Sequence, residues 1–174
     1  ESAIDALASN PTVTLGSNTT FPTNSILQLK HYSRGTSYSD SSIGSSWTNI
    51  PSFEVAITPS SASNKILVIA NFRAGNNGTT SHNGLNFQFR RDIANAGYNN
   101  VGNQLQSNSK DNYGYCITHV MTLIDSPNTT SEIEYTVGYA DIRAATGGSI
   151  FIGSIDTGIE NAYESVIMAM ELKA

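Results

Sequence analysis

The sequence predicts an all-β fold: an antiparallel β-sandwich, jelly-roll-like, with about eight or nine strands. From Ile26 onward, short runs alternate apolar and polar side chains with a two-residue period, which is the period of a half-buried strand. Gly, Pro and Asn turn signals separate these runs. No window of a dozen residues keeps the 3.6-residue period of a helix.

The first three strand candidates differ in how they are covered. Residues 26–32 form the first run, and residues 53–57 alternate apolar side chains at positions 53, 55 and 57. Residues 65–72 are apolar on both faces at their start. This pattern is typical of a central strand covered on both sides, and contact with another subunit is one source of such a cover.

The middle of the chain contains one clear strand and one weakly patterned stretch. Residues 85–89 alternate Leu85, Phe87 and Phe89 with polar residues. The Asn-rich stretch 93–112 has little pattern, and we expect a long loop or two short edge strands there. A loop of that length in a compact domain is usually functional or poorly ordered.

The longest strand candidate and three shorter ones complete the predicted sandwich. Residues 113–124 place on one face Tyr113, Tyr115, Ile117, His119, Met121 and Leu123. Residues 133–139 and 149–155 follow. Residues 166–172 contain helix-favouring Met, Ala, Glu and Leu, but their two-residue period favours a strand.

The 174 residues suit one domain with an N-terminal extension. Residues 1–25 hold Pro11 and Pro22 and show no sustained period, so we expect an extended leader or linker that packs on a neighbouring subunit. Residues 26–174 are expected to form the single sandwich domain. Because the chain starts with Glu rather than Met, an expression product, a processed chain or a fragment is expected.

The composition excludes several classes of partner. Charged residues make up 13%, while Ser, Thr and Asn account for 58 residues, so the surface is neutral and hydrogen-bonding. The net charge of −5 and the scattered Lys and Arg residues argue against nucleic acid and against anionic membranes. No apolar run is long enough for a membrane-spanning helix, and the single Cys116 excludes an intrachain disulfide.

The sequence contains no recognisable catalytic, cofactor or metal motif. It lacks a glycine-rich nucleotide loop, a Gly-x-Ser-x-Gly turn and His spacing of metal sites. Glu132 and Glu134 are expected to be solvated on one strand face rather than a catalytic pair. His119 is expected to be a satisfied, partly buried histidine, and the alternative is a ring of histidines around a trimer axis. We therefore expect a protein that is not an enzyme and has no cofactor.

The stretch 93–112 and the residue after it contain the candidate ligand-binding residues. Aromatic rings stack on the apolar faces of sugars, and amides bind hydroxyl groups, so side chains of both kinds in one loop suit a glycan. The candidates are Tyr98, Asn99, Asn100, Asn103, Gln104, Asn112 and Tyr113. The alternative is an ordinary solvated loop. Trp47 is expected to be a partly buried anchor, and Arg90 and Arg91 a solvated strand end.

Four segments of the chain form a recognisable pattern of turns and strands. The first is Pro11-Thr-Val-Thr-Leu-Gly-Ser-Asn-Thr-Thr-Phe-Pro22 with Ile26-Leu-Gln-Leu29, and the second is Val55-Ala-Ile-Thr-Pro-Ser-Ser-Ala-Ser-Asn-Lys-Ile-Leu-Val68. The third is Leu123-Ile-Asp-Ser-Pro-Asn-Thr-Thr-Ser131 with Tyr135-Thr-Val137, and the last is Ile167-Met-Ala-Met-Glu-Leu172. These segments resemble a domain of tail-fibre and other virion structural proteins of marine phages. The family usually has Arg after the strand equivalent to 85–89, as here at Arg90 and Arg91. The resemblance covers nearly the whole chain from about residue 11.

The resemblance implies a homotrimeric β-sandwich on the surface of a virion. We expect a tail-fibre tip or similar protein that mediates host attachment, binds host-surface glycan through shallow loops and contacts other virion proteins through its N-terminal segment. The resemblance assigns no binding residues, because family members are expected to differ in 93–112. Two alternatives stay open: a structural decoration protein of the capsid or tail without a receptor role, and a cellular carbohydrate-binding module.

Overall fold

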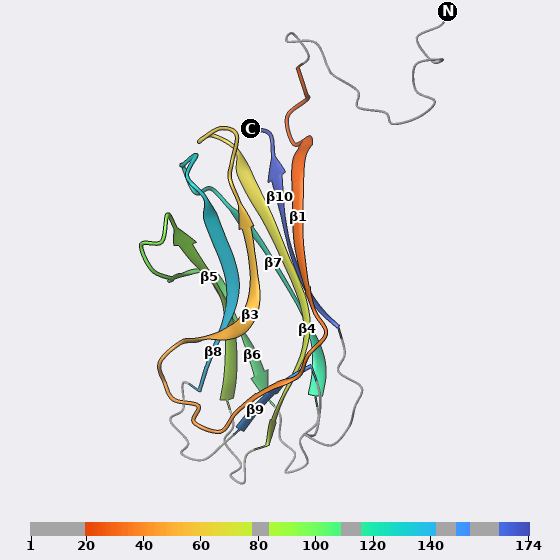
Figure 1. The fold of residues 1–174 in the computed structure, drawn as a ribbon, viewed down its shortest axis with the longest axis vertical. Coiled ribbons are helices and arrows are strands. Elements are labelled where there is room, and N and C mark those ends of the chain that lie inside the picture. Colours follow the sequence, from red (N-terminus) through yellow and green to blue (C-terminus); the bar gives the residue numbers. More distant parts are fainter. Residues whose placement is uncertain (1–19, 78–83, 109–115, 142–148, 154–163) are drawn as a thin grey trace, which may run out of the picture.

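The computed structural model describes residues 20–77, 84–108, 116–141, 149–153 and 164–174, which form a β-sandwich without helices (Figure 1). The predicted leader, residues 1–25, lies mostly outside the described residues, so that division of the chain stays a prediction. The described part contains ten strands: β1 (Ile26–Arg34), β2 (Tyr38–Asp40), β3 (Thr48–Ile57), β4 (Lys65–Asn77), β5 (Gly84–Ile93), β6 (Asn99–Asn108), β7 (Cys116–Asp125), β8 (Ile133–Asp141), β9 (Ser149–Ile152) and β10 (Ser165–Leu172).

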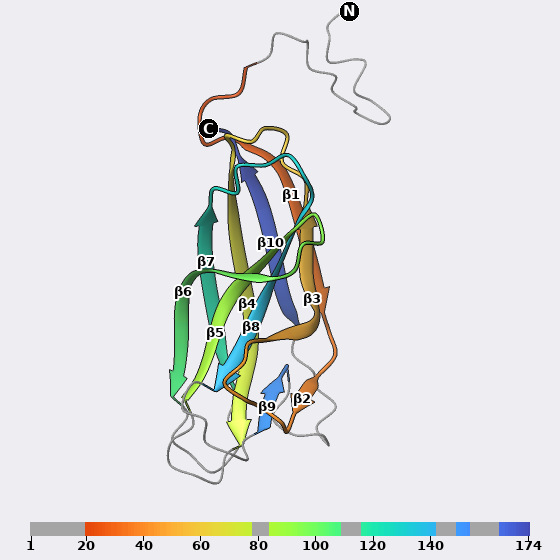
Figure 2. The ribbon, with the colours of Figure 1, turned by 90° about the vertical axis from the view of Figure 1, so that its left-hand side faces the viewer.

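The strands form two antiparallel sheets that lie face to face (Figures 1 and 2). In the six-stranded sheet A, β4 pairs with β7 on one side and with β10 and then β9 on the other. β1 flanks β10, and β2 flanks β9. The four-stranded sheet B has the order β3-β8-β5-β6. The two sheets and the crossovers between them confirm the predicted jelly-roll-like sandwich.

The core lies between the inward faces of the two sheets. On β4 the alternate residues Ile66, Val68, Ala70 and Phe72 are fully buried. The ring of Phe72 contacts Phe53 and Phe87 of sheet B in edge-to-face geometry, with centroids 6.0 and 5.0 Å apart, an arrangement that aromatic pairs prefer.

The alternation predicted for the strands of sheet B is confirmed. Their inward-facing members are buried: Phe53, Val55 and Ile57 on β3, Leu85, Phe87 and Phe89 on β5, and Ile133, Tyr135, Val137 and Tyr139 on β8. Residues 166–172 belong to β10, so the strand prediction there is also correct. Tyr113 and Tyr115 lie outside the described residues.

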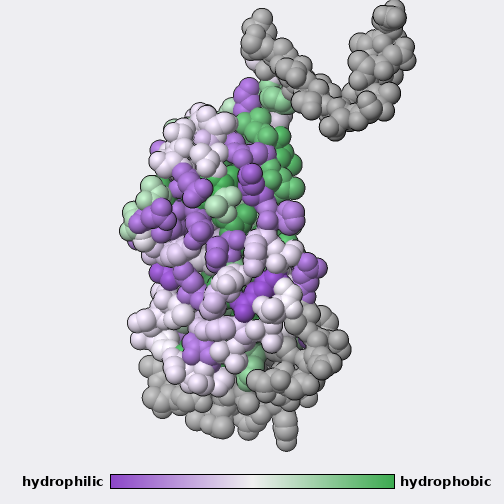
Figure 3. Space-filling view, in the orientation of Figure 1, coloured by the Kyte–Doolittle hydropathy of each residue, from purple (hydrophilic) through white to green (hydrophobic). Residues whose placement is uncertain are grey.

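The opposite side of sheet A, which we call its outer face, combines apolar side chains from four strands with the polar residues His31, Ser33, Lys65, Asn71, Arg73, Thr118 and Thr122. Strand register places the side chains in rows from β1 through β10 and β4 to β7. One row is Leu29, Met170, Leu67 and Ile124. The other apolar members of this face are Ile26, Leu172, Met168, Ile69, Val166 and Val120. Figure 3 shows hydrophobic residues along the margin where β1 lies and mostly polar residues over β3 and β8.

Two strands differ from the sequence prediction. β2 was not predicted, because its three residues are too few to show a period. β6 is a ten-residue edge strand, so for residues 99–108 the expected loop is wrong. The alternative of two short edge strands is correct in type there, although one longer strand forms. The alternation is weak there because most of its described side chains are exposed. Residues 94–98 form the turn before β6, and 109–112 lie outside the described residues.

The buried carboxylate of Glu171 ties β10 to β1 and to the turn between β3 and β4. Glu171 is 1% exposed. Its Oε1 accepts hydrogen bonds from the backbone N–H and hydroxyl of Ser60, at 2.7 Å each, and from Asn64 Nδ2 at 2.6 Å. Its Oε2 accepts one from Gln28 at 2.6 Å. Burial raises the pKa of Glu171, but these donors outweigh it and hold the pKa below its usual value.

Replacing Glu171 with Gln is expected to lower the free energy of unfolding at neutral pH by about 1–3 kcal/mol, because the new NH₂ group faces other donors. A lowered pKa in the folded state stabilises the protein above pH 4.5, and this contribution is lost as the pH falls through the folded pKa. Urea unfolding between pH 7 and pH 3 measures both effects. Glu132→Gln, at an exposed carboxylate, is the control. Equal loss of stability at low pH in Glu171→Gln and the wild type would contradict this role.

Candidate functional site

A wide bulge interrupts β6 at the free edge of sheet B. Between the pairs Phe87–Leu105 and Phe89–Val101, one residue of β5 lies opposite three residues of β6. Gly102 has a φ of 71°, and its carbonyl accepts a hydrogen bond from Gln88 Nε2 at 2.8 Å. Bulges of this kind redirect side chains at sheet edges. Here the bulge leaves Asn103 and Gln104 exposed.

A groove of about 310 Å³ separates this bulge from the edge of sheet A. One wall is β6 from Gly102 to Leu105, and the other is the five consecutive residues of β7 from Val120 to Ile124. Among the described residues no strand pairs with the outer edge of either wall. Figure 2 shows β6 and β7 on the same side of the sandwich. The groove is therefore open to solvent and bordered by two unpaired strand edges.

The groove combines an apolar floor with hydrogen-bonding rims. Phe89 and Met121 line it and are buried, while Val120 and Ile124 are 62% and 60% exposed. Asn103 and Gln104 each offer an amide with both donors and an acceptor. Gln88 Oε1, which is buried behind the bulge, has no hydrogen-bond partner among the described residues. Such a surface suits a neutral, hydroxyl-rich ligand better than a charged one.

Gly102 is required by space as well as by conformation. A Cβ at this position would lie 2.9 Å from Cδ1 of Leu123 on the opposite wall. The absence of a side chain lets β6 and β7 approach each other at the bulge. Isolated glycines in strands often mark a bulge or a close approach of this kind. Gly102 was therefore a sequence signal for the groove, but the prediction for 93–112 did not use it.

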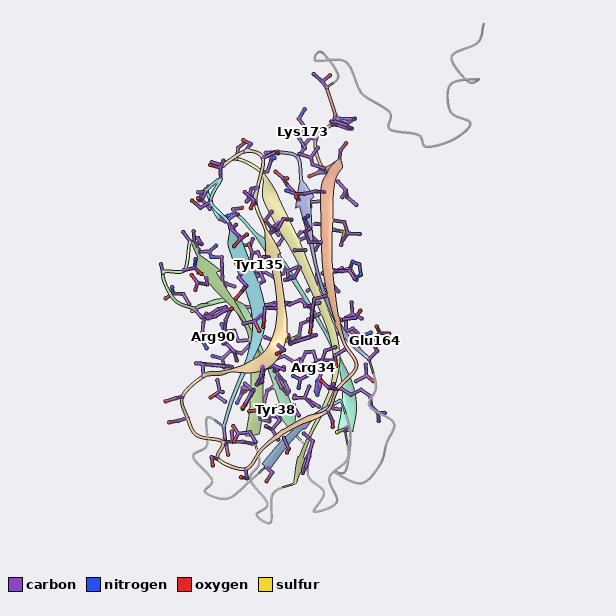
Figure 4. All side chains as sticks on the ribbon, viewed as in Figure 1. Arg34, Tyr38, Arg90, Tyr135, Glu164 and Lys173 are labelled. Carbon is purple, nitrogen blue, oxygen red and sulfur yellow. The ribbon has the colours of Figure 1, made fainter. Side chains whose placement is uncertain are left out.

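Tyr98 does not line the groove but belongs to a cluster on the outer side of sheet B. Its hydroxyl donates to Oε1 of Glu134, and the Arg90 guanidinium lies 5.7 Å from its ring centroid. Arg90, which is labelled in Figure 4, also donates to the side chain of Asn49 and to the carbonyls of Tyr98 and Trp47. The cluster fixes the turn before β6 to β5, β8 and the start of β3.

Three further residues in or beside this cluster are Glu134, Gly138 and Trp47. Burial raises the pKa of Glu134, and the neighbouring carboxylates of Glu54 and Asp92 raise it further. Gly138 leaves room for Arg90, because a Cβ there would lie 2.5 Å from Arg90 Cδ. Trp47 is half-buried, as predicted.

Arg90 and Arg91 are not a solvated strand end. Arg90 is engaged in the cluster around Tyr98, and Arg91 forms an ion pair with Asp125 at 2.6 Å. Asp125 also accepts a hydrogen bond from Tyr135 at 2.7 Å. These interactions depend on which strands become neighbours, and a two-residue pattern does not contain that information.

The seven candidate ligand residues fall into three groups. Asn103 and Gln104 line the groove. Tyr98, Asn99 and Asn100 lie nearer the turn before β6. Asn99 Nδ2 donates to Gly97 O at 3.2 Å, and Asn100 lies opposite Arg90 in the pairing of β6 with β5. Asn112 and Tyr113 lie outside the described residues. The groove residues absent from the prediction are Phe89, Gly102, Leu105 and the five residues of β7. On β7, the outward-facing Val120 and Ile124 resemble ordinary core positions in the sequence.

His119 lies inside the sandwich, so the alternative of a histidine ring around a trimer axis is wrong. Its ring packs against Phe72 and Phe87, with centroids 5.4 and 4.9 Å apart. Its side chain is 6% exposed, and Nε2 has no hydrogen-bond partner among the described residues. The expectation of a buried histidine is correct, but the histidine is only partly satisfied. Burial lowers its pKa, although a hydrogen bond with the backbone of Ala74 acts in the opposite direction.

In the described part of the chain, no three His, Cys, Asp or Glu side chains gather in a way that suits a metal ion. No helix there is long and apolar enough to cross a membrane. The carboxylates near the groove and the cluster are engaged by Tyr98, Arg91 and Tyr135, as described above.

Comparison with solved structures finds similar β-structures at low sequence identity. The Eiger TNF structure from S. frugiperda is 12% identical, with a TM-score of 0.47, over 84% of this chain and 93% of that one. The VP2 subviral particle of infectious bursal disease virus is 13% identical, with a TM-score of 0.43, over 94% of this chain and 42% of that one. The structure of the Gx strain of the same virus is 13% identical, with a TM-score of 0.41, over 93% of this chain and 42% of that one.

These TM-scores are all below 0.5, so the fold assignment rests on the strand pairing and the function on the residues of the site. The chain spans 42% of the viral chains it matches. No protein-family model matches the sequence, and no curated protein is significantly similar to it.

Replacing Gly102 with Ala is expected to destabilise the protein more than replacing Gly97 with Ala. Both glycines have positive φ, 71° and 99°, but a Cβ at 97 has nothing within 4 Å, whereas one at 102 meets Leu123. The Gly97 variant reports the conformational cost alone, about 1 kcal/mol, and contact with Leu123 adds about 1 kcal/mol or more. Thermal or urea unfolding measures the difference. Equal destabilisation would show that β6 and β7 do not approach as described.

His119 is expected to make the protein less stable in weak acid. Because its pKa is lowered in the folded state, the unfolded chain binds the proton more readily, and stability falls as the pH decreases below about 6.5. His119→Leu removes this contribution. Urea unfolding of both proteins between pH 8 and pH 5.5 is the measurement, with each protein compared with itself at pH 8. The same decline with pH in both proteins would rule out His119 as its source.

Proposed function

We propose that this chain is a non-enzymatic surface protein of a virion, of the tail-fibre type, which attaches to neutral glycan on the host surface. The groove between β6 and β7 carries the proposal, because a wide bulge holds two amide side chains exposed beside an apolar floor. Sugars combine hydroxyl groups with apolar ring faces, so a surface of this composition is chemically complementary to them. The resemblance of the sequence to tail-fibre proteins supports the virion location.

The binding chemistry proposed for the groove differs from the one expected for a loop. Phe89, the aromatic residue that lines it, is 2% exposed and offers no ring for stacking. Contact would come from amide hydrogen bonds, from the unpaired strand edges and from the exposed side chains of Val120 and Ile124. Such a site is shallow and weak for a single copy. Display in several copies, as in the proposed homotrimer, converts weak contacts into strong attachment.

The engaged carboxylates support a binding role over a catalytic one. Asp125 is held by Arg91 and Tyr135. Glu134 accepts from Tyr98, and Glu171 accepts four hydrogen bonds. Hydrolysis of a glycan needs two carboxyl groups that face a substrate from opposite sides. Asp125, Glu134 and Glu171 instead stabilise the sandwich.

A structural role on the capsid or tail, without a receptor, is the second candidate function. The exposed apolar side chains on the outer face of sheet A, such as Ile26 and Leu29, favour it, because they suit permanent contact with protein rather than with glycan. In that case the N-terminal segment would dock the chain onto other virion proteins. The two functions differ in whether the isolated protein binds sugar.

The test is binding of the fluorescently labelled protein to an array of bacterial surface polysaccharides. Saturable binding is expected for the wild type. Because two amides are lost, Asn103→Ala combined with Gln104→Ala should weaken it about 10- to 30-fold, at about 1 kcal/mol for each hydrogen bond. Gln106→Ala, at an exposed amide on the same strand outside the groove, is the matched control and should bind normally.

Two results would contradict the attachment function. One is the absence of binding to every polysaccharide by protein that is shown to be folded. The other is binding that the groove double variant retains in full. The first result, together with a fixed position of the protein on the particle by electron microscopy, would favour the structural role.

A further inference from the structure

We propose that a second pocket, at the end of the sandwich where β10 finishes, binds a neutral sugar unit that stacks on Phe21. The inference goes beyond the proposed function, because this pocket shares no residue with the groove between β6 and β7. Three features of the pocket carry it: its size, the way its walls are held, and the hydrogen-bonding groups that its internal contacts leave free.

The pocket lies between three segments that are far apart in the sequence. They are residues 20–28 at the start of β1, the turn between β3 and β4, and the end of β10. Figure 1 shows these segments at the same end of the sandwich, and Figure 4 labels Lys173 there. The pocket has a volume of about 580 Å³, which is larger than the groove at about 310 Å³. Small-ligand pockets have volumes of about 300–1,000 Å³.

The floor of the pocket is polar and fixed before any ligand binds. Glu171 and Asn64 line it and are 1% and 5% exposed. Asn64 Nδ2 donates both to Glu171 and to Ser60 Oγ, the latter at 3.2 Å. Gln28 Nε2 donates to Glu171 and to the carbonyl of Thr58 at 2.7 Å. Because these groups satisfy one another, the floor keeps its shape, and a ligand does not have to order it.

Phe21 provides an exposed aromatic ring at the pocket. It lines the pocket and is 42% exposed. Its carbonyl accepts a hydrogen bond from Lys173 Nζ at 2.7 Å. The backbone N–H of Asn24 donates to the carbonyl of Lys173 at 2.8 Å, and the N–H of Lys173 donates to the carbonyl of Ser25 at 3.0 Å. A ring held in this way gains by covering its face, and the C–H face of a pyranose is a suitable cover. The groove offers no such ring.

The hydrogen-bonding groups that stay free around the pocket suit hydroxyl groups. An ammonium has three donors, and Lys173 uses one of them on Phe21 within the described residues. Both hydrogen bonds of the Gln28 side chain in this part of the chain are made by Nε2, which leaves Oε1 as an acceptor. The hydroxyls of Ser61 and Ser63 bond to each other at 3.0 Å, so one O–H donor remains between them. Donors and acceptors therefore border the pocket together, as the hydroxyl groups of a sugar require.

The charges in the pocket favour a neutral ligand over an ion. The charged side chains that line it are Glu171 and Lys173, whose charges cancel. The Glu171 carboxylate already accepts four hydrogen bonds and is buried, so a ligand cation gains little from it. A ligand carboxylate would bind the ammonium of Lys173 but would share the pocket with the carboxylate of Glu171, and the two would repel each other.

Titration of the full, isotope-labelled chain with the methyl glycosides of glucose, galactose and N-acetylglucosamine tests the proposal, with the backbone amide NMR signals as the readout. We expect saturable shifts of the amides of Ser61, Ser63 and Lys173 with at least one of these sugars. Phe21→Ala should weaken this binding about 5- to 10-fold because the stacking surface is lost, and Phe21→Tyr should keep it. Tyr32→Ala removes a ring that is 41% exposed on β1 outside the pocket, so it is the matched control and should bind like the wild type.

Three results would overturn the proposal. One is the absence of these shifts with every sugar, and another is binding that Phe21→Ala retains in full while its amide spectrum shows that it is folded. The third is tighter binding of methyl glucuronide or methyl glucosaminide than of the neutral sugars, because charge would then decide the binding. The amides of Asn103 and Gln104 report on the groove in the same spectra. Shifts there alone would overturn this inference and leave the proposed function standing, so the two failures are distinguishable.

Discussion

The strand β4 carries apolar side chains on both of its faces, and the rest of the structure depends on this constraint. Ile66, Val68, Ala70 and Phe72 point inward and hold the two sheets together. Leu67 and Ile69 point outward, in the middle of a face to which β1, β10 and β7 add further apolar residues. Burying one face builds the sandwich, and the apolar side chains on the other face stay partly in contact with solvent.

The outer faces of the two sheets differ in character. The outer face of sheet A carries apolar side chains from four strands, and the outer face of sheet B is polar and held by the cluster of Arg90, Tyr98 and Glu134. The free edges of β6 and β7 are the described place where unpaired backbone, exposed amides and a concave surface coincide. The bulge at Gly102 is what turns an ordinary sheet edge into a groove.

The fold class could be predicted because alternation reports directly which side chains enter the core. The strands with one buried face were found for this reason. β6 was predicted only as an alternative to a loop, because an edge strand exposed on most of its length has no such alternation. Likewise, the pairing of Arg91 with Asp125 depends on strand neighbours that local patterns do not specify.

The candidate site was predicted only in part, for a geometric reason. Tyr98 and Gln104 are six positions apart in the sequence, but a turn and a bulge separate them, and they lie on different surfaces. The β7 wall comes from a separate segment of the chain, and its outward-facing Val120 has the same residue type as a core position. His119 shows the same limit, since its inward direction is decided by the pairing of β7 with β4.

Methionine oxidation tests the two faces of sheet A most directly. The chain has three methionines: Met121 is in the core, and Met168 and Met170 lie on the outer face. With hydrogen peroxide at low protein concentration, Met168 and Met170 should oxidise much faster than Met121, as measured by peptide mass spectrometry. Equal oxidation rates of the three methionines in the folded protein would contradict the account.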